Sequence, residues 1–130
     1  MGEPAHGDDR AAAPRAVVIE DDLATQRLLR ELASAAGWQA AGYSRLAPAR
    51  RDMRAHPPEL LLVDDDLPDG RGLDLVRELR ANPRTRNVKV LFCTAADAHR
   101  RREIAAVAPV VPKPFSLIEM EAALAQLRHD

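Results

Sequence analysis

Residues 60–72 read Leu-Leu-Leu-Val-Asp-Asp-Asp-Leu-Pro-Asp-Gly-Arg-Gly, and the class of fold can be inferred from them. Its four apolar residues are typical of a strand covered on both faces, and Asp64 is the first residue after that strand. A turn rich in Pro and Gly follows. Because open α/β sheets bind their ligands at the carboxyl ends of parallel strands, we expect Asp64 to lie at a functional site.

A second strand also ends in acidic residues. The apolar run 16–19 leads into Glu20-Asp21-Asp22, so the two acidic ends converge if the strands are parallel neighbours. Any one of these acids alone could simply cap the next helix. Together they would be costly to bury without a cation, by several kcal/mol. Carboxylates without neighbouring His or Cys favour Mg²⁺, which leaves open positions for water and phosphate.

Strand-like and helix-like patterns alternate five times, which predicts a doubly wound (βα)5 domain of class α/β, with a five-stranded parallel sheet and helices on both faces. The predicted strands cover 16–20, 38–43, 59–64, 88–92 and 110–111. The predicted helices cover 23–36, 48–54, a segment between Gly72 and Asn82, 97–107, and a last helix that begins near Ser116.

The last helix has the clearest start signal. Ser116 and Glu119 have the spacing of a capping box, and Phe115 and Met120 that of a hydrophobic staple. We expect its buried stripe to consist of Leu117, Met120, Leu124 and Leu127. The run 100–102, Arg-Arg-Arg, is interpreted as a solvated face of the preceding helix, with contact to an acidic partner as the alternative.

Composition narrows the classes of function. The 130 residues fit one domain, which we place at 15–130 after a disordered tail at 1–14. With 19 basic and 20 acidic residues, the net charge of -1 gives no general attraction to nucleic acid or acidic membranes. No apolar run is long enough to span a membrane, so we expect a cytoplasmic protein without membrane insertion. The single Cys93 and Trp38 are expected to be core residues.

Two further residues lie at the carboxyl ends of predicted strands. Thr94 ends the fourth strand, and Lys113 follows the fifth in the segment Val-Pro-Lys-Pro-Phe, whose prolines restrict the backbone. Taken singly, Thr94 suggests a hydroxyl bonded to nearby backbone, and Lys113 a surface lysine. Their matching positions instead suggest a hydroxyl and a fixed positive charge for phosphate oxygens.

From about residue 15 to its end, the chain resembles the receiver domains of two-component response regulators, in particular the single-domain, chemotaxis-regulator-like members. Glu20-Asp21 matches the family's acidic pair, and Asp64, Pro68 and Gly72 match the register of the phosphoacceptor. Neither Asp65 nor Asp66 fits that register. Thr94 with Ala95 matches the hydroxyl position, and Lys113-Pro114-Phe115 matches the Lys-Pro-Phe motif.

The resemblance implies a flavodoxin-like fold and a phosphorelay function. Asp64 would accept a phosphoryl group from a phosphohistidine of a sensor histidine kinase or a histidine phosphotransfer protein. Mg²⁺ would be held by Asp21, Asp64 and the backbone carbonyl of Asp66, with Glu20 acting through water. Lys113 and Thr94 would bind phosphoryl oxygens. Such a protein is a signalling domain rather than an enzyme, and catalyses only its own phosphorylation and dephosphorylation. The downstream protein target is not predicted, and homodimer formation stays open.

The chain departs from the family in the segment between Thr94 and Lys113. Val110 stands three residues before the lysine, where most receivers have an aromatic residue, and the segment is about three residues shorter than in the family. We therefore do not carry over the family's usual conformational switch. Asp66 and Ala96 occupy two positions that flank the phosphoryl group in the family and tune its lifetime.

Three other interpretations compete with a phosphorylated receiver. A pseudo-receiver would bind partners without phosphorylation, although the retained acids and Lys113 argue against it. Asp64-Asp65-Asp66 also fits the start of haloacid-dehalogenase-like phosphatases, but Pro68 and the short chain do not. Flavin binding is disfavoured because the acidic first turn would repel the flavin phosphate.

Overall fold

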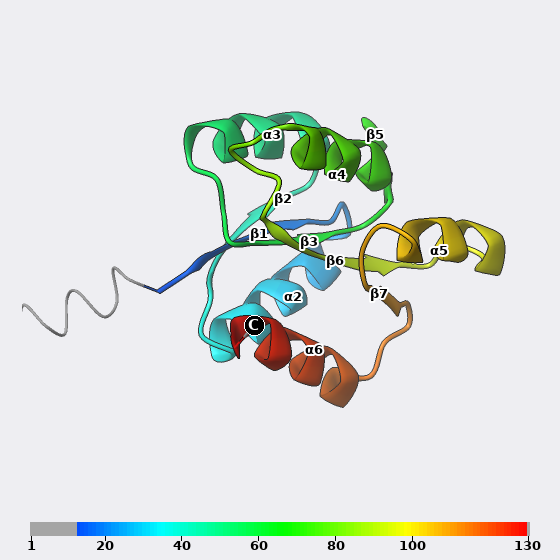
Figure 1. Cartoon of the computed structure of the whole chain (residues 1–130). Helices are drawn as coiled ribbons and strands as arrows, with labels where there is room; N and C mark the ends of the chain where they lie inside the picture. The colour runs from blue at the N-terminus through cyan, green and yellow to red at the C-terminus, as the bar shows by residue number, and fades with distance from the viewer. Residues whose placement is uncertain (1–12, 130) are drawn as a thin grey trace, which may run out of the picture.

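Five parallel strands form the centre of the structure, a computed structural model that describes residues 13–129 (Figure 1). They occur in the order β2-β1-β3-β6-β7. The predicted doubly wound sheet is confirmed. The tail expected at 1–14 lies almost wholly outside the described residues. The strands are β1 (Arg15–Ile19), β2 (Gln39–Tyr43), β3 (Leu60–Val63), β6 (Lys89–Thr94) and β7 (Val110–Pro112).

Helices cover both faces of the sheet (Figure 1). One face carries α2 (Leu23–Ala35) and α6 (Leu117–His129), and the other carries α3 (Leu46–Ala55), α4 (Gly72–Ala81) and α5 (Ala98–Ala105). A short hairpin of β4 (Asp66–Leu67) and β5 (Gly70–Arg71) joins β3 to α4 and was not predicted. None of the described helices is long and apolar enough to cross a membrane.

β3 is buried on both sides, which explains its unbroken apolar sequence. Leu61 and Val63 pack into the core under α3, α4 and α5, whereas Leu60 and Leu62 pack into the core under α2 and α6. Alternating side chains of one strand therefore serve both cores. Because β1 and β3 are parallel neighbours, their carboxyl ends meet at the same edge.

α3 begins at Leu46, two residues before the predicted start at 48. Its first backbone N–H groups, those of Leu46 and Ala47, donate to the carboxylate of Asp69 at 2.7 and 2.9 Å. Asp69 lies in the hairpin after β3, so this cap comes from a distant part of the chain. Local sequence cannot reveal it, although Pro48 does lie in the first turn as expected.

The inner face of α6 differs from the prediction at one position. Met120 and Leu124 are fully buried, and Leu127 packs against the same core. Leu117, however, is 52% exposed, so its assignment to the buried stripe is wrong. Leu117 is the first residue of the helix, and Phe115, in the preceding turn, packs against the core near this end. Ser116 Oγ accepts the Glu119 N–H, as the capping signal predicts.

Trp38 and Cys93 are both buried in the core beneath α2 and α6, as predicted. Burial raises the pKa of the Cys93 thiol to about 12, which disfavours the reactive thiolate. Cys93 therefore acts as a small apolar residue of β6.

Candidate functional site

Three carboxylates meet where β1 and β3 end. Ligand oxygens of Glu20, Asp21 and Asp64 all lie within 4.8 Å of one another. Glu20 and Asp64 are buried and Asp21 is exposed, so the group opens to solvent on one side. The parallel register of Ile19 with Val63 produces this arrangement because Glu20 and Asp64 are the next residues of their strands.

Lys113 reaches into this acidic group from the end of β7. Its Nζ donates to Glu20 Oε1 at 2.6 Å and to Asp64 Oδ2 at 2.9 Å. Its backbone N–H donates to the Thr94 carbonyl at 2.9 Å, which holds the start of the Lys113-Pro114 turn against β6. Burial alone would lower the pKa of Lys113, but the bonds to both carboxylates outweigh it and raise that pKa, so the ammonium stays charged.

Glu20 is held at both its side chain and its backbone. Its Oε2 accepts the Asp22 N–H at 3.0 Å, and its carbonyl accepts Gln26 Nε2 at 2.9 Å. Burial raises the pKa of Glu20, and the bonds from Lys113 and Asp22 offset part of that rise. The role of Gln26 was missed. A Cβ at Gly42 would lie 2.2 Å from Gln26 Oε1, so Gly42 provides the space that this side chain needs.

Gly72 allows α4 to start directly against Asp64. A Cβ at Gly72 would lie 2.3 Å from the Asp64 carbonyl oxygen, closer than van der Waals contact permits. The Gly72 N–H also donates to the Asp65 carbonyl at 2.9 Å. This close approach gives a physical reason for glycine eight residues after Asp64.

Thr94 and Asp66 complete the surroundings of Asp64. Thr94 is buried at the end of β6, and its Oγ1 accepts the Ala96 N–H at 3.3 Å. The Asp66 N–H points to Asp64 Oδ1 at 3.4 Å, whereas the residue itself is exposed. Asp64, Thr94 and Asp66 all line one open cleft of about 570 Å³. The cleft is large enough for a phosphoryl group and water.

Asp65, the residue after Asp64, has entirely different partners. It is buried, and its carboxylate accepts bonds from Arg71, Arg100 and the Leu73 backbone N–H. Burial alone would raise the pKa of Asp65, but these donors lower it below its ordinary value. The interpretation of Arg100 as part of a solvated face is therefore wrong, because Asp65 draws this side chain inward. Arg102 is exposed as expected.

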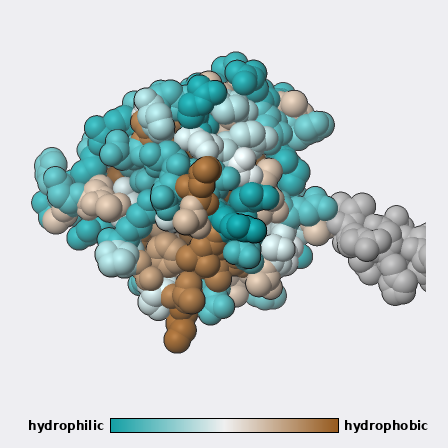
Figure 2. Space-filling view, turned by 180° about the vertical axis from the view of Figure 1, so that it is seen from behind, coloured by the Kyte–Doolittle hydropathy of each residue, from teal (hydrophilic) through white to brown (hydrophobic). Residues whose placement is uncertain are grey.

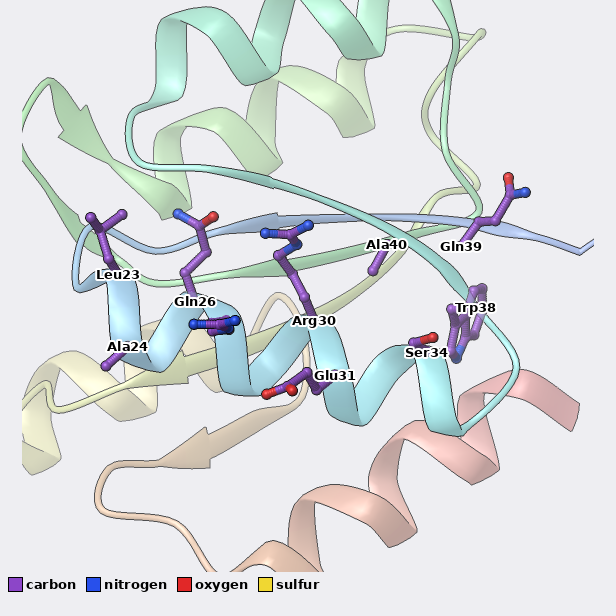
Figure 3. A pocket seen from close by; sticks show the side chains of 10 residues that line it. Leu23, Ala24, Gln26, Arg30, Glu31, Ser34, Trp38, Gln39 and Ala40 are labelled. Atoms are coloured by element: carbon purple, nitrogen blue, oxygen red, sulfur yellow. The ribbon is translucent and has the colours of Figure 1, made fainter.

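A larger open hollow, of about 800 Å³, lies along α2 and β2 (Figure 3). Its lining side chains include Arg30, Glu31, Ser34 and Trp38. The acidic group of Glu20, Asp21 and Asp64 is not part of its lining, nor are Thr94 and Lys113. Chemistry rather than size therefore identifies the smaller cleft as the candidate site.

Comparison with known proteins agrees with this geometry. The family model described as "Response regulator receiver domain" matches residues 16–125. The chain belongs to this family. Its members are the receiver modules of two-component signalling. This assignment rules against a haloacid-dehalogenase-like phosphatase and against a flavin-binding protein.

Curated relatives include the phosphate regulon transcriptional regulatory protein PhoB of Rhizobium meliloti, 34% identical over 84% of this chain and 49% of PhoB. The chain thus spans about half the length of that relative. The polar-differentiation response regulator DivK of Brucella anthropi is 29% identical over 80% of this chain and 88% of DivK.

A solved receiver domain shares the fold. It is the receiver domain of the sensor histidine kinase PA1611 of Pseudomonas aeruginosa. The two structures match with a TM-score of 0.79 at 22% sequence identity, and the match covers 92% of this chain and 100% of that domain. That receiver has a magnesium ion coordinated in its active-site cleft. In the present chain, the group of three carboxylates without His or Cys is a donor set that suits Mg²⁺.

Proposed function

We propose that Asp64 accepts a phosphoryl group from the phosphohistidine of a sensor histidine kinase or a histidine phosphotransfer protein. The observation that carries this proposal is the Lys113 ammonium, which bridges Asp64 and Glu20 in a group with more carboxylates than cations. The excess negative charge favours a divalent cation, and the fixed ammonium favours a phosphoryl oxygen.

The transfer is a displacement at phosphorus. One Asp64 carboxylate oxygen attacks the phosphorus atom, the P–N bond to the donor histidine breaks, and its electron pair returns to the imidazole nitrogen. Lys113 and the Thr94 hydroxyl then bind phosphoryl oxygens. Asp21, Asp64 and the Asp66 carbonyl would hold Mg²⁺, with Glu20 acting through water. When bound, the metal supplies positive charge that offsets the charge of the transferring group.

Exposed apolar side chains support a protein donor. In the described residues, the large apolar side chains that remain exposed are Leu23, Leu117 and Ile118, the last 79% exposed. They lie at the starts of α2 and α6, which both begin at the carboxyl edge of the sheet. Figure 2 shows apolar atoms gathered on the rear face of a mostly hydrophilic surface. Such a patch suits docking of a protein.

Intact mass after incubation with Mg²⁺ and acetyl phosphate tests the acceptor. We expect a gain of one phosphoryl group in the wild type and in Asp65→Asn, but none in Asp64→Asn. If the wild type gains no mass, beryllofluoride binding separates a short-lived phosphoryl group from none. Absence of both would favour a pseudo-receiver, and equal gain in Asp64→Asn would exclude Asp64 as the acceptor.

The protein donor is tested separately. Ile118→Ser should slow transfer from a phosphorylated histidine phosphotransfer protein while leaving phosphorylation by acetyl phosphate unchanged, because the small donor needs no docking surface. Equal slowing with both donors would contradict the docking role. A kinase donor also implies the cytoplasm, where ATP is available, as the site of action.

A further inference from the structure

Two guanidinium groups, those of Arg71 and Arg100, pair with the single negative charge of Asp65. Its Oδ1 accepts from the Leu73 N–H at 3.0 Å and from Arg100 Nη2 at 3.2 Å. Its Oδ2 accepts from Arg71 Nη2 at 3.0 Å and from Arg100 Nε at 2.8 Å. Without Arg100, each oxygen would keep one donor and the carboxylate would keep one cation. Arg100 can therefore leave without making Asp65 an unpaired buried charge.

Arg100 is also close to the place of the chemistry. It lines the same cleft as Asp64 and Thr94, and its side chain is 21% exposed. Its remaining partner, Glu103, is bonded at 2.7 Å and is itself well exposed, so that pair holds Arg100 weakly. Ile104 is the buried residue of α5, so the helix that carries Arg100 is lightly anchored.

A phosphorylated Asp64 would be a stronger partner for Arg100 than Asp65 is. A phosphoryl group carries a charge of about -1.5 to -2 and three acceptor oxygens. Asp65 carries a single charge, which it shares with Arg71. A guanidinium group binds phosphate oxygens through two parallel hydrogen bonds, a geometry that an ammonium cannot reproduce.

We infer that Arg100 is a second cationic residue for the phosphoryl group. It holds Asp65 while Asp64 is free, and it moves to the phosphoryl oxygens when Asp64 is phosphorylated. Arg71 lies on β5, paired with β4, and stays with Asp65. The moving guanidinium takes the first turn of α5 with it, so the exchange also links the acceptor to this helix. The inference rests on the proposed function of Asp64.

Affinity for beryllofluoride, a phosphoryl mimic, tests the exchange. We would titrate it in the presence of Mg²⁺ and follow the bound form by fluorine NMR, using Arg100→Met, Asp65→Asn and the double variant. Arg102→Met is the matched control, because Arg102 is an exposed arginine of the same helix. Mg²⁺ affinity alone and a urea unfolding curve for each variant report whether the site is intact.

Arg100→Met should bind beryllofluoride about tenfold more weakly, the loss expected for hydrogen bonds to a charged group. Asp65→Asn should bind it more tightly, because the competing anion is gone and the shape is kept. That gain should vanish when Arg100→Met is also present. Arg102→Met should match the wild type. Misfolding would only lower the affinity for beryllofluoride, so it cannot produce the higher affinity that we expect for Asp65→Asn.

Unchanged or tighter binding by Arg100→Met would overturn the inference, and tighter binding would mean that the Asp65–Arg100 pair only restrains α5. A gain from Asp65→Asn that persists in the double variant would overturn it as well. If the wild type binds no beryllofluoride, the proposed function fails and the inference fails with it. If the wild type binds and Arg100→Met binds equally, the proposed function stands and only this inference is lost.

Discussion

Asp64 and Asp65 are adjacent at the end of β3, yet their carboxylates have opposite electrostatic surroundings. Asp64 belongs to a group of three carboxylates that shares one ammonium, from Lys113. Asp65 alone accepts bonds from two guanidinium groups and a backbone N–H. Their side chains diverge as successive side chains of a strand do, one toward β7 and the other toward α4 and α5.

The contrast shows that partners rather than residue type decide what a carboxylate does. The Asp64 side has more carboxylates than cations, so it favours a divalent cation. On the Asp65 side both carboxylate oxygens already have two donors each, and the carboxylate joins α4 and α5 to the end of β3. Four substitutions test this difference, and they are given in order of decreasing effect on the protein.

Gly72→Ala should have the largest effect, because it disturbs both sides at once. The added Cβ would lie 2.3 Å from the Asp64 carbonyl oxygen and would push α4 away from β3. We expect the free energy of unfolding in urea to fall by about 3 kcal/mol, the upper part of the range for overpacking. Phosphorylation of Asp64 should slow as well. Ser34→Thr adds a methyl group at an exposed position and should cost far less.

Lys113→Met tests the shortage of cations around Asp64. Without the ammonium, Glu20 and Asp64 repel each other, and we expect a loss of about 2 kcal/mol in unfolding free energy in metal-free buffer. Added Mg²⁺ should stabilise this variant more than it stabilises the wild type, because the metal replaces the missing charge. Equal stabilisation of both proteins would contradict this view of the site.

Asp65→Asn tests the surroundings of Asp65 through the pH dependence of the free energy of unfolding. The folded state lowers the pKa of Asp65, so its ionised form stabilises the fold above the unfolded pKa. That stabilisation disappears as the pH falls through the lowered value. The free energy of unfolding in urea should therefore fall less steeply between neutral and acidic pH in Asp65→Asn than in the wild type. Asp74→Asn, an exposed acid of α4, should keep the wild-type slope.

Arg71→Met should have the smallest effect. Its guanidinium makes one bond to Asp65 and is 51% exposed, so we expect a loss of at most about 1 kcal/mol in unfolding free energy. Arg100→Met, which removes two bonds to the same carboxylate, should cost more. The reverse order would show that Arg71 is the main partner of Asp65.

Patterns along the chain were enough to predict the sheet and the group around Asp64. The apolar runs before Glu20 and Asp64 are typical of strands that are buried on both faces, as in a parallel sheet covered by helices. The prediction failed where a contact came from a distant segment. Asp69 capping α3 and Asp65 holding Arg100 both join residues more than twenty positions apart. Leu117 shows a different failure, because apolar spacing cannot tell where the neighbouring core ends.

The amino-acid sequence was sufficient to predict the order of strands and helices along the chain and the carboxyl-end positions of Glu20, Asp21, Asp64, Thr94 and Lys113, and its residue types at these positions lead us to expect Mg²⁺ binding. These follow from hydrophobic periodicity and residue chemistry, which are local properties of the chain. How neighbouring acids divide their partners depends on contacts between distant segments of the chain. Asp64 and Asp65 have the same side chain. Their electrostatic surroundings differ because Lys113 lies beside Asp64, whereas Arg71 and Arg100 lie beside Asp65.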